Sequence, residues 1–404
     1  MNHLKAFKSA TIRRHCGAIA LALIVALTPA AFADEVPVAK PPVSAAAMAE
    51  YRALLEAYNT AHDAYVAAVS AYWSSIADRR RLRFAKRAAG QPIALEDYVL
   101  TQPPVYSGPP KPVDPSAAKE QAPPAPATTV PVVADFLKAA LQEFNFTPRK
   151  PENDIDFKRA YARAAAAAGL TKDQVVRIYS FEATGNGTYD LQAGLEYNTP
   201  GAHAITTALG YNQLLATNSV ELMAEQGDRF VASLQAKAKL VPDDQRSRLE
   251  RTIAVVAAMI AVSRSVPDDW NQHQLLADTP KGLAIHAMNL DLDVGPLLQV
   301  QNLVESVTYA RRKGRAGDLT AAELEMLNLT GDGNGFDMIE IPQERRNQIP
   351  TANFFQRGGY ADNSIVRRNN MVATLLAATD AAMDEESKKP GAKDLAAVFP
   401  DQAK

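Results

Sequence analysis

The stretch DDQRSRLERTIAVVAAMIAVSRS, residues 243–265, decides the fold class. Its apolar residues recur at the spacing of an α-helix, and Pro242 followed by two aspartates marks a helix start. The fully apolar run from Thr252 to Val262 is shorter than the roughly 20 residues that a membrane-spanning helix needs. We therefore predict that this stretch is the central buried helix of a globular domain.

The same helical period continues on both sides of this stretch, so the expected fold class is all-α. Sustained alternation of apolar and polar residues, which is typical of strands, is absent. The segments with helical spacing and a polar face are DFLKAALQEF (135–144), DFKRAYARAAAAAGL (156–170), KDQVVRIYSFE (172–182), SVELMAEQGDRFVASLQAKAKL (219–240) and GPLLQVQNLVESVTYARR (295–312). We expect one helical domain over residues 134–384 and a polar C-terminal tail over residues 385–404.

The N-terminal residues 1–33 have the pattern of a secretory signal peptide. Basic residues precede an apolar run from Gly17 to Leu27, and Ala31-Phe32-Ala33 supplies the small residues of a cleavage site. We predict export to the periplasm with cleavage after Ala33, and an uncleaved membrane anchor is the alternative. The one cysteine, Cys16, lies inside this segment, so the mature chain has neither a disulfide nor a cysteine metal site.

Residues 34–92 contain a long segment without proline or glycine, from Ser44 to Ala89. Tyrosines recur in it every seven residues, which predicts one coiled-coil-like helix that self-associates or binds a protein partner. The helix ends in a basic cluster, which is either a solvated helix end or a patch for an anionic surface such as phospholipid or cell-wall polymer. The tyrosines are Tyr51, Tyr58, Tyr65 and Tyr72, and the basic cluster is Arg79, Arg80, Arg81, Arg83, Lys86 and Arg87.

Residues 93–133 are rich in proline, with ten prolines between Pro103 and Pro131. This composition predicts a semi-extended linker between the long helix and the helical domain. Its first part, YVLTQPPVYSGPP, contains enough tyrosine and valine to lie along a surface. The formal net charge of the whole chain is −2, which does not indicate a protein that binds nucleic acid.

The segment VVRIYSFEATGNGTYDLQAG, residues 175–194, carries the strongest candidate for chemistry. The helix should end near Glu182, because Gly185 and Gly187 favour a turn. The C-terminal end of a helix and apolar neighbours both favour the protonated form of a carboxylic acid, which is what a glycosidic oxygen needs as a general acid. A plain capping or salt-bridging glutamate at the surface is the alternative.

Polar residues after Glu182 are expected to face the same opening. They are Thr184, Thr188, Tyr189 and Asp190. A second polar segment, ALGYNQLLATNS at residues 208–219, follows after about 28 residues; its glycine allows a close approach of the backbone, and Gln213 offers an amide that both donates and accepts.

An acidic FE-x-x-G at a helix end, followed by G-x-x-Q, resembles the lytic transglycosylase (SLT-type) branch of the lysozyme-like superfamily. The resemblance covers residues 170–235, and Ala183 stands where the family usually has serine. It implies that Glu182 is the catalytic acid and base. It also implies that Gly210, Tyr211, Asn212 and Gln213 are the second motif, which shapes the sugar groove, and that Tyr360 supplies the tyrosine of the family's Ala-Tyr-Asn-Ala-Gly segment.

The resemblance implies cleavage of the β-1,4 bond between N-acetylmuramic acid and N-acetylglucosamine in peptidoglycan. One glutamate protonates the leaving oxygen and then, as carboxylate, deprotonates the muramyl 6-hydroxyl to close a 1,6-anhydro ring. No cofactor is needed. A distance of about 6.5–9.5 Å from Glu182 to Asp190 would instead permit inverting hydrolysis with water. The alternative is a non-catalytic scaffold that binds glycan or protein with a degenerate lysozyme-like fold.

A metal site is not expected. GDGNGFDMIE, residues 331–340, resembles a calcium loop, but Asp337 stands where such a loop has glycine and Gln343 where it has an acidic residue. We predict a polar, glycine-rich turn there. The mature histidines are isolated from one another, without a zinc-binding spacing.

Overall fold

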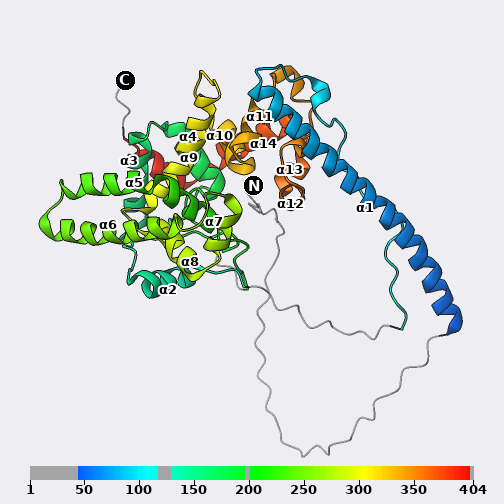
Figure 1. Ribbon diagram of the computed structural model, residues 1–404, viewed down its shortest axis with the longest axis horizontal. Helices are drawn as coiled ribbons and strands as arrows, with labels where there is room; N and C mark the ends of the chain where they lie inside the picture. Colours follow the sequence, from blue (N-terminus) through cyan, green and yellow to red (C-terminus); the bar gives the residue numbers. More distant parts are fainter. Residues whose placement is uncertain (1–43, 117–128, 196–200, 401–404) are drawn as a thin grey trace, which may run out of the picture. The chain divides into compact units, whose positions relative to one another are not determined.

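The structure is a computed structural model that describes residues 44–116, 129–195 and 201–400 (Figure 1). The predicted signal peptide lies outside the described residues. Among those described, the elements are helices, with only three isolated β-bridges and no extended strand, so the all-α fold class is confirmed. No described helix has both the length and the apolar character needed to cross a bilayer.

The described residues fall into two compact units. The larger comes from the described residues within the ranges 75–102 and 129–400, and the smaller from residues 44–74 and 103–116. The long helix α1 (Ala45–Ala88) contributes to both. The helices of the larger unit after α1 are α2 (Val133–Phe144), α3 (Asp154–Ala167), α4 (Lys172–Glu182), α5 (Ala216–Ala238), α6 (Asp243–Ser263), α7 (Trp270–Ala277), α8 (Pro280–His286), α9 (Gly295–Arg312), α10 (Ala321–Thr330), α11 (Asp332–Ile339), α12 (Arg357–Asp362), α13 (Ser364–Arg368), α14 (Val372–Glu386) and α15 (Pro390–Val398).

Short 3₁₀ helices complete the larger unit: η1 (Leu95–Asp97), η2 (Ala287–Leu290), η3 (Gln343–Arg345) and η4 (Thr351–Asn353). Several α-helices begin at residues whose side chains accept a hydrogen bond from the first turn. Thr171 caps α4 in this way, and Thr320 caps α10. In both helices a side chain three residues later bonds back to the cap, which completes a capping box.

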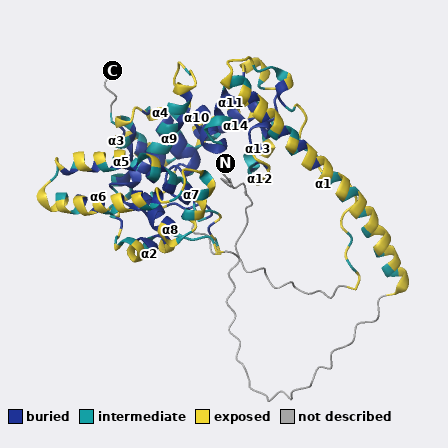
Figure 2. Ribbon diagram, in the orientation of Figure 1, coloured by how far each residue is buried: buried dark blue, intermediate teal, exposed yellow. Residues whose placement is uncertain are grey.

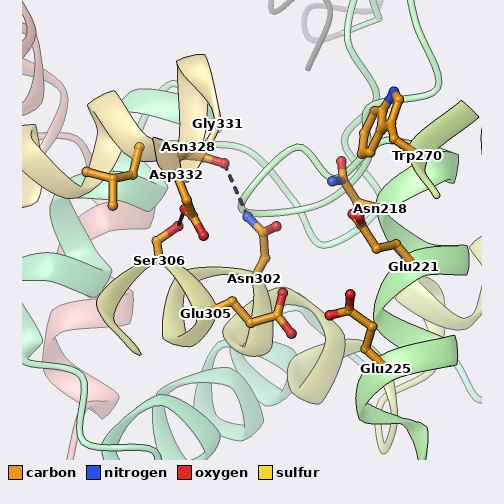
Figure 3. A pocket seen from close by; sticks show the side chains of 11 residues that line it. Asn218, Glu221, Glu225, Trp270, Asn302, Glu305, Ser306, Asn328, Gly331 and Asp332 are labelled. Atoms are coloured by element: carbon orange, nitrogen blue, oxygen red, sulfur yellow. Dashed lines mark hydrogen bonds between the residues drawn. The ribbon is translucent and has the colours of Figure 1, made fainter. Parts of the chain in front are cut away.

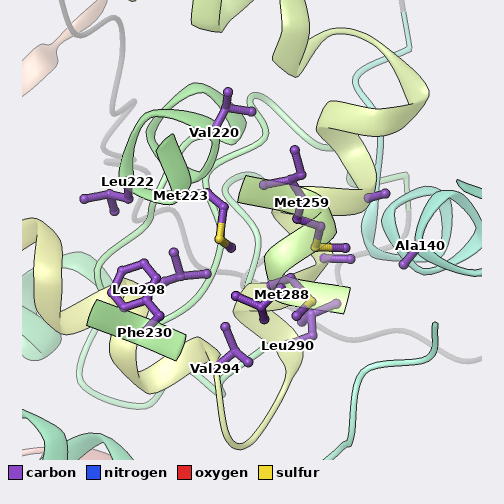
Figure 4. Packing of buried hydrophobic residues seen from close by; sticks show 14 of the residues in the cluster. Ala140, Val220, Leu222, Met223, Phe230, Met259, Met288, Leu290, Val294 and Leu298 are labelled. Carbon is purple, nitrogen blue, oxygen red and sulfur yellow. The ribbon is translucent and has the colours of Figure 1, made fainter. Parts of the chain in front are cut away.

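The main hydrophobic core lies where α5 packs on α6, α7 and α8, with α2 and α9 beside it. Figure 4 shows Met223, Met259 and Met288 pointing into this cluster, together with Val220 and Leu298. Unbranched methionine side chains fill irregular gaps between helices that cross at different angles. The core therefore holds α5 and α9 in place, and these two helices carry much of the candidate site.

The prediction that residues 243–265 form a central buried helix is wrong in its second part. The helix α6 is present, but only one face of it is buried, through Leu249, Val256, Met259 and Ile260 against α5. Ala254, Ala257, Ala258 and Ala261 on its other face are exposed, as Figure 2 shows in yellow along this helix. Alanine counts as apolar in a sequence pattern, yet its small side chain costs little to expose. The alanine-rich run from Thr252 to Val262 therefore predicted a more deeply buried helix than the structure contains.

In the smaller unit, a part of the tyrosine stripe is covered by the chain itself. Tyr106, from the proline-rich segment, packs against Tyr58, His62 and Tyr65 with ring centroids 5.4–6.1 Å apart. Edge-to-face aromatic contacts of this kind are favourable beyond the area that they bury. The start of the proline-rich segment therefore lies along the helix, as its tyrosine and valine content indicated.

The basic end of α1 is neither simply solvated nor a free patch, so both readings of this cluster are wrong for most of its members. Arg83 is fully buried, and its Nε lies 2.7 Å from Oδ2 of Asp337, which is also fully buried. Arg87 donates to the other oxygen of the same carboxylate. Lys86 pairs with Asp97 in η1. Only Arg79 and Arg81 of this cluster are exposed.

The buried Arg80 donates to the backbone carbonyls of Asn353 and Phe355, so this arginine is also bound within the larger unit. Residues 75–102 therefore belong to the helical unit. The expected domain boundary at residue 92 is wrong, because the contacts of the preceding residues extend into that unit. The reason is that the carboxylate partner of Arg83 and Arg87 lies about 250 residues further along the chain, where no local pattern shows it.

Two other expectations also differ from the structure. GDGNGFD is not a polar turn, because Asp332–Ile339 forms the helix α11 with Phe336, Asp337 and Met338 buried. The segment 385–404 is not wholly a polar tail, because Pro390–Val398 forms α15, which packs on α3 and α4 and buries Leu395. In both segments a few apolar residues among polar ones provide buried contacts. The polar composition of each segment as a whole therefore did not indicate a packed helix.

Candidate functional site

Glu182 is the last residue of α4, as expected, and it is 5% exposed. The Nδ2 of Asn328, on α10, donates a 2.9 Å hydrogen bond to Oε1 of Glu182. The same amide group lies 3.3 Å from Oε2 of the buried Glu325. Glu182 is therefore an oriented carboxyl group inside the larger unit rather than a surface glutamate.

A pocket of about 300 Å³ lies directly beyond Asn328. It is lined by the polar face of α5, the start of α7, the polar face of α9 and the junction of α10 with α11 (Figure 3). The lining residues are Asn218, Glu221, Glu225, Trp270, Asn302, Glu305, Ser306, Leu327, Asn328, Gly331 and Asp332. Because Asn328 both lines the pocket and binds Glu182, it connects the two.

Hydrogen bonds order the wall between α9 and the α10–α11 junction. Asn302 donates to Oδ1 of Asn328 at 3.2 Å, and Ser306 donates to Asp332 at 2.6 Å. Together with the bond from Asn328 to Glu182, this makes a chain of three side chains from the pocket to the end of α4.

Carboxyl groups dominate the electrostatics of the pocket. Burial, followed by the charges of neighbouring carboxylates, raises the pKa of Glu305 to about 8 and that of Glu221 to about 7. Burial raises the pKa of Glu225 and of Asp332 as well. The lining contains no lysine, arginine or histidine. Near neutral pH, Glu305 therefore keeps its proton and can donate a hydrogen bond, and about half of the Glu221 groups keep theirs.

No group of three or more histidine, cysteine, aspartate or glutamate side chains among the described residues is arranged to hold a metal ion. The acidic residues of the pocket are thus not grouped as metal ligands would be. Amides, carboxylic acids and one indole face the cavity, which is the mixture of polar groups and an aromatic surface that suits a polyhydroxylated, uncharged ligand.

The residues of the second motif, 210–213, are buried, and several of their side-chain hydrogen bonds go to backbone carbonyls. A Cβ on Gly210, whose φ is +81°, would lie 2.6 Å from Nε2 of Gln299, so only glycine fits there. Gln213 donates to the carbonyls of Leu191 and Gly210. Tyr211 and Asn212 are fully buried, and the Asn212 amide donates to the carbonyl of Gln299. These side chains fix the shape of the segment and do not line the described pocket.

Tyr161 on α3 links the second motif with Glu182. Its hydroxyl donates a 2.8 Å hydrogen bond to Oδ1 of Asn212. Burial, and to a lesser extent the nearby Glu182 carboxyl, raises the pKa of this hydroxyl above its ordinary value. Tyr161 therefore bonds to Asn212 and lies close enough to Glu182 for its carboxyl charge to act on the hydroxyl.

The other expected site residues lie elsewhere. Asp190 is exposed and accepts a hydrogen bond from Thr188, while the backbone of Tyr189 donates to Asp154. The carbonyl of Thr184 accepts from Lys389. Tyr360 lies on α12 and is nearly buried. None of these expected residues lines the described pocket, which places Asp190 away from the cavity where a water-activating carboxylate would act.

Sequence reasoning missed the pocket residues on α5, α9 and α10. Asn218, Glu221 and Glu225 recur at spacings of three and four on α5, and Asn302, Glu305 and Ser306 do so on α9. Each set reads as the solvated face of an amphipathic helix, because a polar face toward water and a polar face toward a pocket have the same pattern. Polar and acidic residues gathered on one face of each of two helices are the signal that the sequence offered.

Comparison of the chain with models of known protein families, with curated proteins and with solved structures finds no match.

Proposed function

We propose that the chain is an exported peptidoglycan lytic transglycosylase that cleaves the bond between N-acetylmuramic acid and N-acetylglucosamine with Glu182 as its single acid and base. The observation that carries the proposal is the position of Asn328, which orients Glu182 and forms part of the pocket wall. The buried carboxyl group at the end of α4 is consistent with the FE-x-x-G resemblance.

A further observation supports the same assignment. The family's third segment has an asparagine with a glycine two residues later; here Asn328, which donates to Glu182, has Gly331 three residues later, at the end of α10. Tyr360, the residue first proposed for this segment, does not line the pocket. We therefore propose that the residues around Asn328 take the role of the third segment.

In the proposed reaction, protonated Glu182 gives its proton to the glycosidic oxygen while the bond to the muramyl C1 breaks. The resulting carboxylate removes the proton of the muramyl 6-hydroxyl, whose oxygen then bonds to C1 and closes the anhydro ring. Glu182 ends protonated, so no water, second carboxylate or cofactor is consumed. Since Asn328 stands between Glu182 and the cavity, its side chain must turn aside or the glycosidic oxygen must enter beside it.

The pocket supplies binding groups for the glycan strand in this proposal. The indole of Trp270 offers a flat apolar surface to a sugar ring, and the amides of Asn218 and Asn302 can donate to and accept from its hydroxyl and acetamido groups. The exposed parts of the tyrosine face of α1 remain the proposed site of self-association or of a protein partner.

The test is mass analysis of the fragments that the purified protein releases from peptidoglycan, with Glu182→Gln beside it. The exchange is nearly isosteric and removes only the ionisable proton, so we expect anhydro-muramyl fragments from the wild type and none from the variant. Glu323→Gln is the matched control, because Glu323 is a similarly buried carboxyl whose capping role glutamine can keep. Full activity in Glu182→Gln would refute the assignment.

The second candidate is a non-catalytic scaffold that binds glycan or a partner protein. The observation that favours it is the 5% exposure of Glu182 behind Asn328. Retention of the wild-type protein on purified cell wall, with no fragment released, would support this candidate.

A further inference from the structure

We propose that Glu305 is a positioning residue of this pocket, whose carboxylic acid donates a hydrogen bond to a substituent of an uncharged sugar ring. The inference rests on the proposed function for the kind of ligand, a glycan. It adds a residue that neither the catalytic step nor the resemblance assigns.

Glu305 forms part of the cavity wall on the side of α9. It lies on α9 one turn after Asn302 and next to Ser306, and both of these side chains line the same pocket. Figure 3 shows the carboxyl group of Glu305 pointing across the cavity toward that of Glu225, with Glu221 on the same face of α5. The side chain thus points into space that a ligand would fill.

One oxygen of Glu305 has no partner in the protein. Its Oε1 is buried and makes no hydrogen bond to any described residue. A buried polar atom without a partner carries a free-energy cost, which a ligand group that bonds to it would remove. The neighbouring Asn302, Ser306 and Asn328 are all engaged in hydrogen bonds, so Glu305 differs from the rest of this wall.

The acidic side chains around Glu305 favour its protonated form, in which its carboxyl group is a hydrogen-bond donor. The titratable groups that face it are Glu221 and Glu225 from α5 and Asp332 from α11, while α7 and α10 contribute only uncharged side chains to the lining. Burial, followed by the charges of these carboxyl groups, raises the pKa of Glu305 to about 8, so it holds its proton at neutral pH. A protonated carboxylic acid donates one hydrogen bond, whereas a carboxylate only accepts.

A preference for uncharged rings follows. A sugar with a free carboxylate would meet Glu221, Glu225 and Asp332 without a basic side chain to balance it. An N-acetylglucosamine unit carries no charge and offers carbonyl and hydroxyl acceptors to Glu305. The pocket is therefore expected to take the N-acetylglucosamine side of the strand.

The test is calorimetric binding of the N-acetylglucosamine trimer at pH 6 and pH 9. At pH 9 about a tenth of the Glu305 groups keep their proton, so the affinity of the wild type should fall about tenfold between the two values. Glu305→Gln keeps an uncharged donor at the same place, so it should bind at pH 6 within about threefold of the wild type and lose little at pH 9. Glu143→Gln removes one exposed carboxylate on α2 and should follow the wild type.

Equal affinity of the wild type at both pH values would overturn the proposal, as would an absence of binding at pH 6. Loss of binding by a folded Glu305→Gln at both values would also overturn it. Release of anhydro fragments together with pH-independent binding would refute the role of Glu305 and leave the proposed function standing. Binding with the expected pH dependence, without any cleavage, would support Glu305 and refute the lytic activity.

Discussion

Asn328 donates a 2.9 Å hydrogen bond to Glu182 across 146 residues of sequence and lines the pocket with the same side chain. The bond joins the end of α4 to the end of α10, and Asn302 on α9 donates to Asn328 in turn. Three helices thus meet at one amide group. The orientation of Glu182 depends on this junction, and so does any chemistry of its carboxyl group.

Replacing Asn328 with alanine should lower the rate of fragment release by about 100-fold, and it should also cost about 1–3 kcal/mol of stability because it removes hydrogen bonds to buried carboxyl groups. The variant removes the donor that orients Glu182, and small displacements of a catalytic group cost rates of this order. Steady-state release of soluble fragments measures the effect. Asn347→Ala, at an exposed position between η3 and η4, should leave the rate unchanged. Unaltered release by a folded Asn328→Ala protein would show that the orienting bond is unnecessary.

Breaking the buried pair of Arg83 and Asp337 should reduce the free energy of unfolding by about 3–5 kcal/mol, because one charge is left buried with less compensation. Urea unfolding of Arg83→Met measures this cost. The Arg83→Met, Asp337→Leu double variant should recover a large part of it, since neither charge then remains from the pair.

Arg81→Met is the matched control for that experiment. Arg81 lies on the same helix and pairs with Asp78, but the two side chains are 73% and 61% exposed. Exposed pairs contribute about 0–1 kcal/mol. A loss in Arg83→Met no larger than that in Arg81→Met would contradict the account of the basic cluster as buried structure.

The acidic pocket should make the protein less stable as the pH rises from about 4.5 to 8. In the unfolded chain Glu305 and Glu221 lose their protons near pH 4.5, whereas the folded protein keeps them until about 8 and about 7. The folded state binds more protons over this range, so stability falls with pH. Glu305→Gln should therefore raise the Tm at pH 8 more than at pH 4.5. Equal shifts at both pH values would mean that burial does not hold the proton.

His286 should produce the opposite dependence on the acidic side. Burial lowers its pKa to about 4, and the neutral ring fits its partners: Nε2 lies 2.8 Å from the carbonyl of Thr207, to which it donates, and Nδ1 lies 2.8 Å from the hydroxyl of Ser219, from which it accepts. The stability that this group contributes above pH 6.5 is therefore lost as the pH falls toward 4.

Urea midpoints of the wild type and His286→Gln at pH 7 and pH 4.5 measure this dependence. Carboxyl groups also titrate in this window, so the difference between the two proteins is the quantity of interest. The wild type should lose more on acidification than the variant does. Identical losses would remove His286 as the cause.

The sequence allowed some of this structure to be predicted because the relevant signals are local. The segment without glycine or proline coincides with α1, and the threonine cap and the glycines after Glu182 locate both ends of α4. The position of Glu182 at a helix end followed from these signals alone. Helix starts and stops are set by hydrogen bonds between near neighbours, which a pattern can show.

The remaining features depend on contacts between distant segments. All ten residues of α10 are buried, including Glu323, Glu325 and Asn328. The helix therefore lacks the exposed polar face by which an amphipathic helix is recognised in a sequence. The partner of Arg83 lies 254 residues away in a segment that reads as a turn. The pocket exists because the polar faces of α5 and α9 meet, and the sequence of one helix does not indicate that the other lies opposite it. Tertiary packing decides such features.

The most direct test of the central claim is digestion of peptidoglycan in water enriched in ¹⁸O, followed by mass analysis of the muramyl ends. If Glu182 closes the ring with the sugar's own 6-hydroxyl, the released ends will be 1,6-anhydro and will contain no label, and Glu182→Gln will release nothing. Reducing ends that carry ¹⁸O, or equal release by the Glu182→Gln protein, would contradict a single-glutamate lytic transglycosylase.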